Sequence, residues 1–322
     1  MKYAAGQMNS LGKARRPFFF MLDFELERPV IHALDELPGD IIISTSLFDN
    51  SDPAKHNTAN AIINEIQPLT FSGYKKAFDN VINNIQHGNS YLLNLTFPTS
   101  IKTEAELEDF FYCSRAKYRL LLKNKFVVFS PEIFVRIDKE GTIRSFPMKG
   151  TIDASVCGAE RIILEDEKEK AEHNTIIDLI RNDLSINASD VRVERYRYID
   201  TIETSSYSLL QVSSEIAGEL GPAWHARAGS IISSMLPAGS ISGAPKKETL
   251  RIIRESENSE RGYYTGVFGI FNGKELDSAV MIRFIEQNER GYVYRSGGGI
   301  TYLSDAEKEY NELIRKIYVP VG

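Results

Sequence analysis

Cysteine is scarce in this sequence, with two residues, Cys113 and Cys157, among 322. Two are too few for a disulfide framework, and their spacing is not that of metal ligands. We also expect no signal peptide, because Asp23 interrupts the apolar run that begins at Pro17. No stretch approaches the ~20 apolar residues that cross a bilayer. We therefore expect a cytoplasmic protein with free thiols and no membrane contact.

Other absences narrow the function. The 38 basic and 44 acidic residues give a net charge of −6, so no overall field attracts nucleic acid. The nucleotide-binding motifs GxGxxG and GxxxxGK[ST] do not occur. No internal repeat and no linker rich in Pro, Gly or Ser divides the chain. We expect a single domain over residues 1–322, with 1–70 as a short N-terminal portion and 71–318 as the core.

Hydrophobic periodicity predicts strands in runs that are separated by helices. Such runs are typical of an α+β sandwich and not of a doubly wound sheet. We expect strands at 18–24, 41–46, 91–97, 126–130, 133–137, 143–148, 263–271, 277–286 and 292–300, the last three as a meander. We expect helices after Ser72, after the capping pair Thr103 and Glu106, from about 160 to 180, near Trp224, at Pro245, and after Ser304 and Glu307.

Lys149 lies in the segment PMKGT, at the expected end of a strand. A lysine beside a glycine turn is usually solvated. As a catalyst it would need an apolar pocket, where loss of hydration lowers the pKa of the amine and makes it a nucleophile. The spacing alone leaves both interpretations open.

Glu172 precedes Ile176 by four residues in EHNTIIDLIRNDL, so it continues the apolar face of a helix. An inward carboxylate needs a cationic partner or a metal ion. Either an arginine pair or a metal site satisfies this pattern. The neighbouring His173, taken alone, is typical of a packed and hydrogen-bonded histidine.

Two glycine-rich segments also suggest a site. LPAGSISGAPK leads into a helix and offers backbone N–H groups to an anion, although a flexible turn has the same composition. Three successive glycines, Gly297 to Gly299, weaken a strand and indicate that something approaches the backbone closely. Glu312 and Lys316 follow on the last helix, at a spacing that is also typical of a surface ion pair.

Taken in order, these motifs resemble those of the chorismate-binding enzymes, a family that includes anthranilate synthase component I, aminodeoxychorismate synthase component I and the isochorismate and salicylate synthases. The resemblance covers residues 72 to 316 and rests on GNSYLLNLT, SPE, PMKGT, EHNTIIDLIRNDL, LPAGSISGAPK, RGYYTG, RSGGGI and EYNE. It implies the fold of anthranilate synthase component I, a sandwich of two antiparallel or mixed sheets flanked by helices.

The resemblance also implies roles for individual residues. Mg²⁺ would be held by Glu172 and Glu312, with Glu309 nearby, and would chelate the ring carboxylate of chorismate. Glu132 of SPE would be the general acid for the departing carbon-4 hydroxyl. The remaining expected contacts with the substrate come from Thr151, Ser240, Tyr264, Arg283, Gly297, Gly299 and Lys316.

Lys149 indicates the branch of the family. Anthranilate synthases carry alanine at this position, and the hydroxylating relatives carry a water-activating lysine where this sequence has Leu92. The resemblance therefore implies amination of chorismate at carbon 4, with Lys149 as a covalent nucleophile. The expected product is 4-amino-4-deoxychorismate, a precursor of 4-aminobenzoate and folate.

The chain has no glutaminase signature, so we expect its ammonia to come from a separate glutamine amidotransferase. A family histidine aligns with Gln211, and the arginine often found after GT is missing. Anthranilate synthase and isochorismate or salicylate synthase activities remain alternatives. A non-catalytic scaffold for the amidotransferase is a further alternative, disfavoured by the retention of Lys149, Glu132, Glu172 and Glu312.

Overall fold

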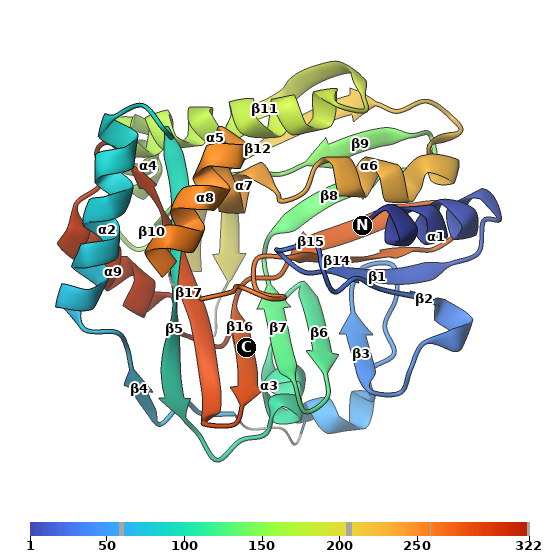
Figure 1. Ribbon diagram of the computed structural model, residues 1–322, viewed down its shortest axis with the longest axis horizontal. Helices are drawn as coiled ribbons and strands as arrows, with labels where there is room; N and C mark the ends of the chain where they lie inside the picture. Colours follow the sequence, from blue (N-terminus) through green and yellow to red (C-terminus); the bar gives the residue numbers. More distant parts are fainter. Residues whose placement is uncertain (58–60, 204–207, 258, 321–322) are drawn as a thin grey trace.

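The computed structural model describes residues 1–57, 61–203, 208–257 and 259–320, and its strands form two sheets (Figure 1). Every strand pairing among these residues is antiparallel. The first sheet has the order β10 (Met148–Asp153), β12 (Ser208–Glu219), β9 (Thr142–Ser145), β8 (Ile133–Ile137), β15 (Leu276–Val280), β14 (Val267–Phe271), β1 (Phe18–Leu22) and β2 (Val30–Ala33), and β11 (Ser189–Glu203) pairs with β12.

The second sheet contains the strand that carries the three glycines. Its order is β13 (Gly243–Ala244), β5 (Leu92–Lys102), β17 (Gly291–Thr301), β16 (Phe284–Asn288), β7 (Phe126–Ser130), β6 (Tyr118–Leu122) and β3 (Ile41–Ser44), and β4 (Glu65–Gln67) pairs with β5. Gly297, Gly298 and Gly299 pair with Thr96, Leu95 and Asn94 of β5.

Strand β1 shows how the sequence specifies the sandwich. Its five residues are all buried, and successive side chains point to opposite faces. Phe19 and Met21 pack in one cluster with Leu120 and Val128 of the second sheet. Phe18 and its alternate neighbours pack in another cluster, on the helix-covered side. The run of apolar residues is therefore a strand covered on both faces, as expected for the centre of a layered fold.

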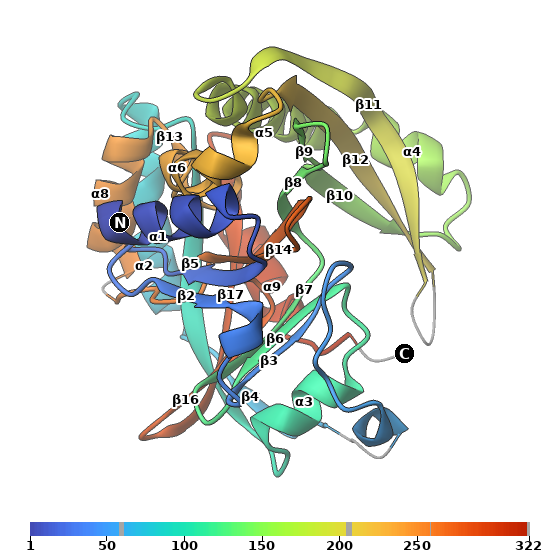
Figure 2. The same cartoon turned by 90° about the vertical axis from the view of Figure 1, so that its right-hand side faces the viewer.

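Helices cover the outer faces of the sandwich (Figures 1 and 2). They are α1 (Lys2–Lys13), α2 (Phe71–Gln86), α3 (Leu107–Cys113), α4 (Ala159–Glu165), α5 (Glu167–Ser185), α6 (Ala228–Ser234), α7 (Gly239–Ser242), α8 (Lys246–Glu257) and α9 (Ala306–Arg315), with 3₁₀ turns at Leu34–Glu36, Pro53–Asn57 and Trp224–Arg227. The helix α5 contacts β10, β12 and α7, and α9 contacts β17 and α2.

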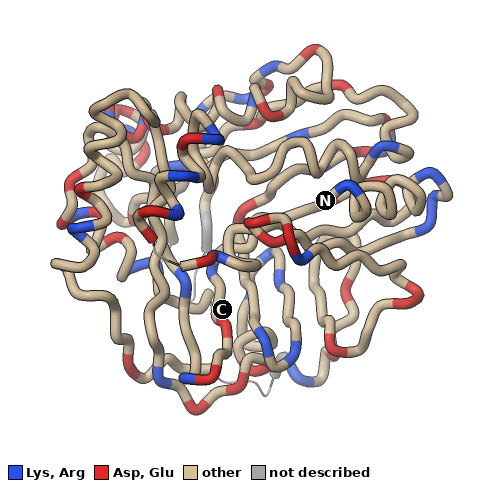
Figure 3. Tube along the Cα trace, viewed as in Figure 1, with Lys and Arg blue, Asp and Glu red and all other residues tan. Residues whose placement is uncertain are grey.

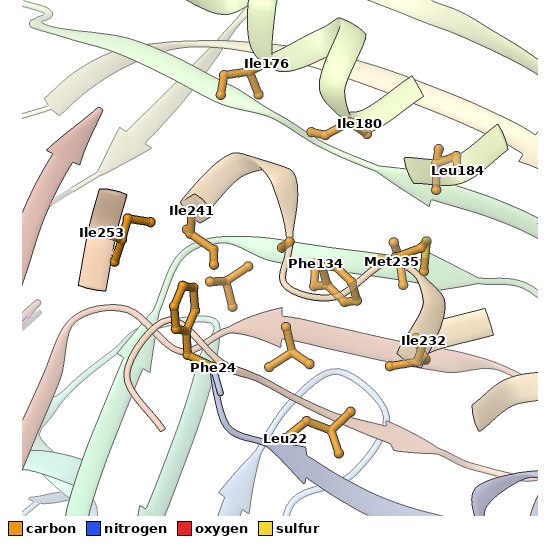
Figure 4. Close-up of a cluster of buried hydrophobic side chains, with 14 of the residues drawn as sticks. Leu22, Phe24, Phe134, Ile176, Ile180, Leu184, Ile232, Met235, Ile241 and Ile253 are labelled. Atoms are coloured by element: carbon orange, nitrogen blue, oxygen red, sulfur yellow. The ribbon is translucent and has the colours of Figure 1, made fainter. Parts of the chain in front are cut away.

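The apolar face of α5 positions the short helix α7. Ile176, Ile180 and Leu184 recur at helical spacing and point toward Met235 and Ile241 (Figure 4). Because Glu172 lies one turn before Ile176, the same periodicity places its carboxylate at the buried side of the helix, where it is 6% exposed.

Acidic and basic residues are interspersed along the trace of the described residues (Figure 3). Within the described part of the chain, no helix is both long and apolar enough to cross a membrane. The α+β sandwich of two antiparallel sheets with flanking helices confirms the fold class expected from the sequence.

Several expected elements have different boundaries. The expected strand 277–286 is two strands, β15 and β16, which belong to different sheets, so the C-terminal strands do not form one meander. The expected helix 160–180 is interrupted at Asp166, which caps α5 by accepting from the N–H of Glu169. The caps of α3 and α9 are Glu106 and Asp305, not Thr103 and Ser304.

Candidate functional site

Lys149 lies inside β10 and not at the end of a strand. A bulge at Gly150, whose φ is +78°, shifts the pairing of β10 with β12 between Lys149 and Thr151. The Lys149 Nζ lies 3.2 Å from Glu172 Oε2. A Cβ atom added to Gly299 would lie 3.3 Å from the same Nζ. The glycine of β17 therefore leaves the space into which the lysine extends.

The charge on Lys149 differs from the sequence-based expectation. Burial alone would lower the pKa of its amine. The nearby carboxylates of Glu172, Glu312 and Glu169 raise this pKa by more than burial lowers it, so the net shift is upward. A depressed pKa was expected from burial alone. That expectation was wrong, because it left out the acidic residues that face the lysine.

Glu132 precedes β8 and meets Ser240 of α7. The Ser240 hydroxyl donates to Glu132 Oε1 over 2.9 Å. Burial raises the pKa of this carboxyl group, although Ser240, Lys149, Arg283 and Lys316 oppose the shift. Three cations therefore lie near this carboxyl group, and its pKa is nevertheless higher than that of an exposed glutamate. Such a group can donate a proton, as the expected general acid would.

The loop that carries Ser240 is held from α5. Asp183 accepts from the N–H of Gly239 over 3.1 Å and pairs with Lys246 at 2.6 Å. A small cavity beside Glu132 and Ser240 is also lined by Asp183 and Ile180. The glycine-rich segment is therefore a fixed part of the site, and its short helix positions a hydroxyl against Glu132.

The carboxylates expected to bind a metal come from α5 and α9. Glu309 Oε2 and Glu312 Oε1 lie 3.5 and 3.8 Å from the position that a Cβ would take on Gly298. Lys316 binds Glu312 at 2.7 Å and donates to the carbonyl of Gly297 over 2.9 Å. The middle glycine of the run thus allows two carboxylates and an ammonium to approach β17.

Arg283 lies in the bend between β15 and β16, with φ at +52°, and not in the middle of a strand. A bulky residue with this backbone conformation is typical of a constrained functional position. Its Nε is buried without a hydrogen-bond partner, and its terminal nitrogen reaches the Tyr318 hydroxyl at 3.4 Å. Tyr264 lies close enough to interact electrostatically with Arg283, and burial raises the Tyr264 pKa to about 12.

Two expected residues have a different setting. Thr151 is exposed and pairs with Gln211 of β12, and no described contact links it to the carboxylates. Gly297 has a structural reason to be glycine, because an added Cβ would lie 2.5 Å from the carbonyl oxygen of Leu95.

His173 is buried and contacts Ser214 Oγ through Nε2 over 2.7 Å, as expected of a packed histidine.

Sequence reasoning missed two residues of this region, Glu169 and Tyr318. Glu169 precedes Glu172 by three positions on α5, and an i,i+3 spacing on one helix face could have indicated it. The Tyr318 ring lies over the guanidinium of Arg283, with its centroid 4.9 Å from Arg283 Cζ. No local sequence motif predicts this contact.

The donor set is suitable for Mg²⁺, which prefers oxygen ligands and often uses one or two carboxylates together with water and substrate. Glu172 Oε1 is buried and accepts no hydrogen bond. Among the described residues, however, no group of three or more Asp, Glu, His or Cys side chains is close enough to hold a metal as it stands. Lysines lie between the carboxylates, so a metal site would need these side chains to move.

Relatives cover the whole chain. An uncharacterized PabA-like protein of Pasteurella multocida is 47% identical over 317 residues, 98% of each chain. Another, from Haemophilus influenzae, is 46% identical over 326 residues, 100% of this chain and 97% of the relative. A probable aminodeoxychorismate synthase of Oryza sativa is 32% identical over 199 residues, 59% of this chain and 22% of the relative.

Solved structures share the fold. Anthranilate synthase component I of Streptococcus pneumoniae has a TM-score of 0.67 at 26% identity, over 83% of this chain and 61% of its own. The menaquinone-specific isochorismate synthase of Escherichia coli has a TM-score of 0.72 at 14% identity, over 98% and 80%. The sequence profile of chorismate binding enzymes matches residues 24–321. The chain belongs to the chorismate binding enzyme family.

Proposed function

We propose that this protein aminates chorismate to 4-amino-4-deoxychorismate and that Lys149 is the covalent nucleophile. The observation that carries the proposal is the position of Lys149: its Nζ lies between Glu172 and the backbone of Gly299, within the electrostatic reach of Glu132. An amine in this position faces both the proposed proton donor and the proposed metal ligands. The similarity to an aminodeoxychorismate synthase of Oryza sativa supports the same activity.

The chemistry needs one proton donor and one nucleophile. Glu132, whose pKa is raised by burial, gives its proton to the carbon-4 hydroxyl, which leaves as water. The neutral Lys149 amine adds at carbon 2 as that bond breaks, which gives a secondary ammonium, and both ring double bonds shift. Ammonia then adds at carbon 4, the double bonds shift back, and the lysine leaves carbon 2 as a neutral amine. A proton of the new ammonium group restores the acid form of Glu132. The products are 4-amino-4-deoxychorismate and the regenerated enzyme.

Lys149 must lose its proton before it attacks. The carboxylates around it favour the ammonium form. Glu172 pairs with the amine at 3.2 Å, and this attraction weakens when another cation neutralises the charge of Glu172. Lys149 therefore becomes a nucleophile when another cation binds the acidic residues around it.

We propose that this cation is Mg²⁺, held by Glu172 and Glu312 with Glu309 beside them. When bound, it would bind a carboxylate of chorismate and offset the negative charge of the glutamates. Arg283 is positioned to hold the second carboxylate of the substrate, because its Nε is buried and has no partner. Lys316 lies near Arg283 and adds a second cation on this side of the site, and the Tyr264 phenol also lies near Arg283.

We propose a separate glutamine amidotransferase as the source of ammonia, and a place for the reaction in the synthesis of 4-aminobenzoate. Leu92, the residue at the position of the water-activating lysine in hydroxylating relatives, is 2% exposed and its side chain lies beside Gly299. An apolar side chain cannot activate water. This disfavours isochorismate and salicylate formation at this site.

Identification of the product tests the proposal. Purified protein is incubated with chorismate, Mg²⁺ and ammonium, and the products are separated and identified by mass spectrometry. We expect 4-amino-4-deoxychorismate, which an added aminodeoxychorismate lyase converts to 4-aminobenzoate. Anthranilate or isochorismate as the main product, or no turnover of chorismate, would overturn the proposal.

A further inference from the structure

Lys168 connects the two helices that carry the acidic residues. Its Nζ lies 3.6 Å from Glu172 Oε1 on α5 and 3.3 Å from Glu309 Oε1 on α9. The side chains of Glu172 and Glu309 are only 8% and 4% exposed, whereas that of Lys168 is 36% exposed. One ammonium therefore bridges two buried carboxylates from a position that is open to solvent.

The two carboxylates depend on this ammonium. Among the described residues, Glu309 forms an ion pair with Lys168. Glu172 has Lys149 at its Oε2, but its Oε1 is buried and accepts no hydrogen bond. Buried carboxylates are unfavourable without a nearby positive charge. Lys168 supplies that charge between α5 and α9.

We propose that Lys168 is a tethered cation that competes with a divalent cation for the carboxylate of Glu172, and that it must withdraw from Glu172 and Glu309 before the divalent cation binds. The inference rests on the magnesium site of the proposed function. It adds that the site is closed by a residue of the chain itself. Lys168 is then a positioning residue, which sets how strongly the free enzyme holds metal.

The exposed fractions of Lys168, Glu172 and Glu309 indicate that the lysine moves toward solvent when the metal ion binds. The carboxylates are fixed in the core, but the lysine has a flexible stem and a path to solvent. A site that is open for only part of the time binds its ligand more weakly by that fraction. An attached ammonium beside the carboxylates therefore lowers the apparent affinity for a free cation without touching the substrate.

Metal binding without substrate tests this role. Mn²⁺ is used as a probe for Mg²⁺, and free Mn²⁺ is measured by electron paramagnetic resonance in titrations of the substrate-free protein. We expect Lys168→Met to bind Mn²⁺ at least ~10-fold more tightly than the unmodified protein, because the competing charge is gone. Lys168→Arg keeps the charge and should bind as weakly as the unmodified protein.

Lys170 provides the matched control. It lies on the same helix, is 44% exposed and pairs with Glu167 at 3.8 Å, away from Glu309. Lys170→Met should leave Mn²⁺ affinity unchanged, which excludes an effect of net charge alone. Equal affinity in Lys168→Met and the unmodified protein, weaker binding in Lys168→Met, or no Mn²⁺ binding in any variant would overturn the inference. No chorismate is present, so these outcomes are independent of the product test above.

Discussion

Glu132 combines burial with a hydroxyl donor, and this makes its protonation the first property to test. Because burial raises its pKa, the carboxyl group is protonated at a higher pH than an exposed glutamate. Glu132→Gln removes the transferable proton but keeps the shape and the hydrogen bond with Ser240. We expect turnover to fall by about 10²–10⁴, with chorismate binding retained, as measured by steady-state kinetics and calorimetric titration.

The proposed role of Glu132 also predicts the direction in which the reaction rate changes with pH. A general acid must be protonated, so the rate should decline as the pH rises through the elevated pKa of Glu132. The residual rate of Glu132→Gln should lack that decline. A variant with a near-normal rate, or one with the same alkaline limb, would assign the proton transfer to another group.

Lys149 is the residue on which the proposed chemistry depends. Incubation with chorismate and Mg²⁺ in the absence of ammonia should leave an adduct on the peptide around Gly150, detectable by mass spectrometry. Lys149→Ala should lose the adduct and most of the aminodeoxychorismate, because no amine remains in the pocket. Slow direct addition of ammonia at carbon 2, as in the alanine-bearing relatives, can persist.

Lys168→Ala is a useful comparison for this experiment, because it also removes a lysine beside Glu172 but leaves Lys149 in place. It should still form the adduct on the peptide around Gly150. Full aminodeoxychorismate production by Lys149→Ala would contradict covalent catalysis.

At this scale the sequence predicted which residues meet, but not their charge states. Motif order predicted Glu132, Lys149 and Glu172, and the structure brings these three side chains into one region. The direction of the Lys149 pKa was not predictable, because it depends on distances to carboxylates on two helices. Tyr318 was not predictable either, since its contact with Arg283 arises from the path of the chain after α9.

At the scale of elements, a buried ion pair joins parts of the fold that surround the site. Arg261 donates to Glu257 over 2.9 Å and to the carbonyl of Ile241 over 3.0 Å. Glu257 in turn accepts from the N–H of Thr96 over 2.8 Å. Both side chains of the pair are 1% exposed. The pair thus links α8, α7 and β5.

Removal of one partner should therefore be costly. Arg261→Met leaves the Glu257 carboxylate buried without a counter-charge, and we expect a loss of about 3–5 kcal/mol in the free energy of unfolding. Urea denaturation measures this difference. Arg251→Met, on the exposed face of α8, should change the free energy of unfolding by less than about 0.5 kcal/mol. Equal effects of the two substitutions would show that the buried network does not stabilise the fold.

The elements that sequence reasoning missed are those that tertiary contacts stabilise. The helix α1 contains Gly6 and Gly12, which weaken helix propensity, but it packs against α6. A Cβ added to Gly12 would clash with the carbonyl oxygen of His225, so this glycine permits close packing of α1 on the 3₁₀ turn that precedes α6. Likewise, the segment 277–286 reads as one apolar strand, and only the fold shows that it leaves one sheet for the other at Arg283.

At the scale of the whole molecule, the site is assembled from distant parts of the chain. Glu172 on α5 and Glu312 on α9 are 140 positions apart in the numbering, and in the folded state both carboxylates act on Lys149. A ligand that contacts both therefore binds the native protein and not the unfolded chain. Such a ligand stabilises the native state in proportion to the logarithm of its concentration relative to Kd.

This linkage gives a test of the metal ligands that does not require turnover. With chorismate and Mg²⁺ together at about 100 times Kd, the expected stabilisation is about 2.7 kcal/mol, seen as a rise of several degrees in Tm by differential scanning fluorimetry. Glu172→Gln and Glu312→Gln should each lose most of the rise that Mg²⁺ adds to chorismate alone. Glu167→Gln, exposed in the first turn of α5, should keep it. If both site variants gained as much from Mg²⁺ as the unmodified protein, the metal would have to bind elsewhere.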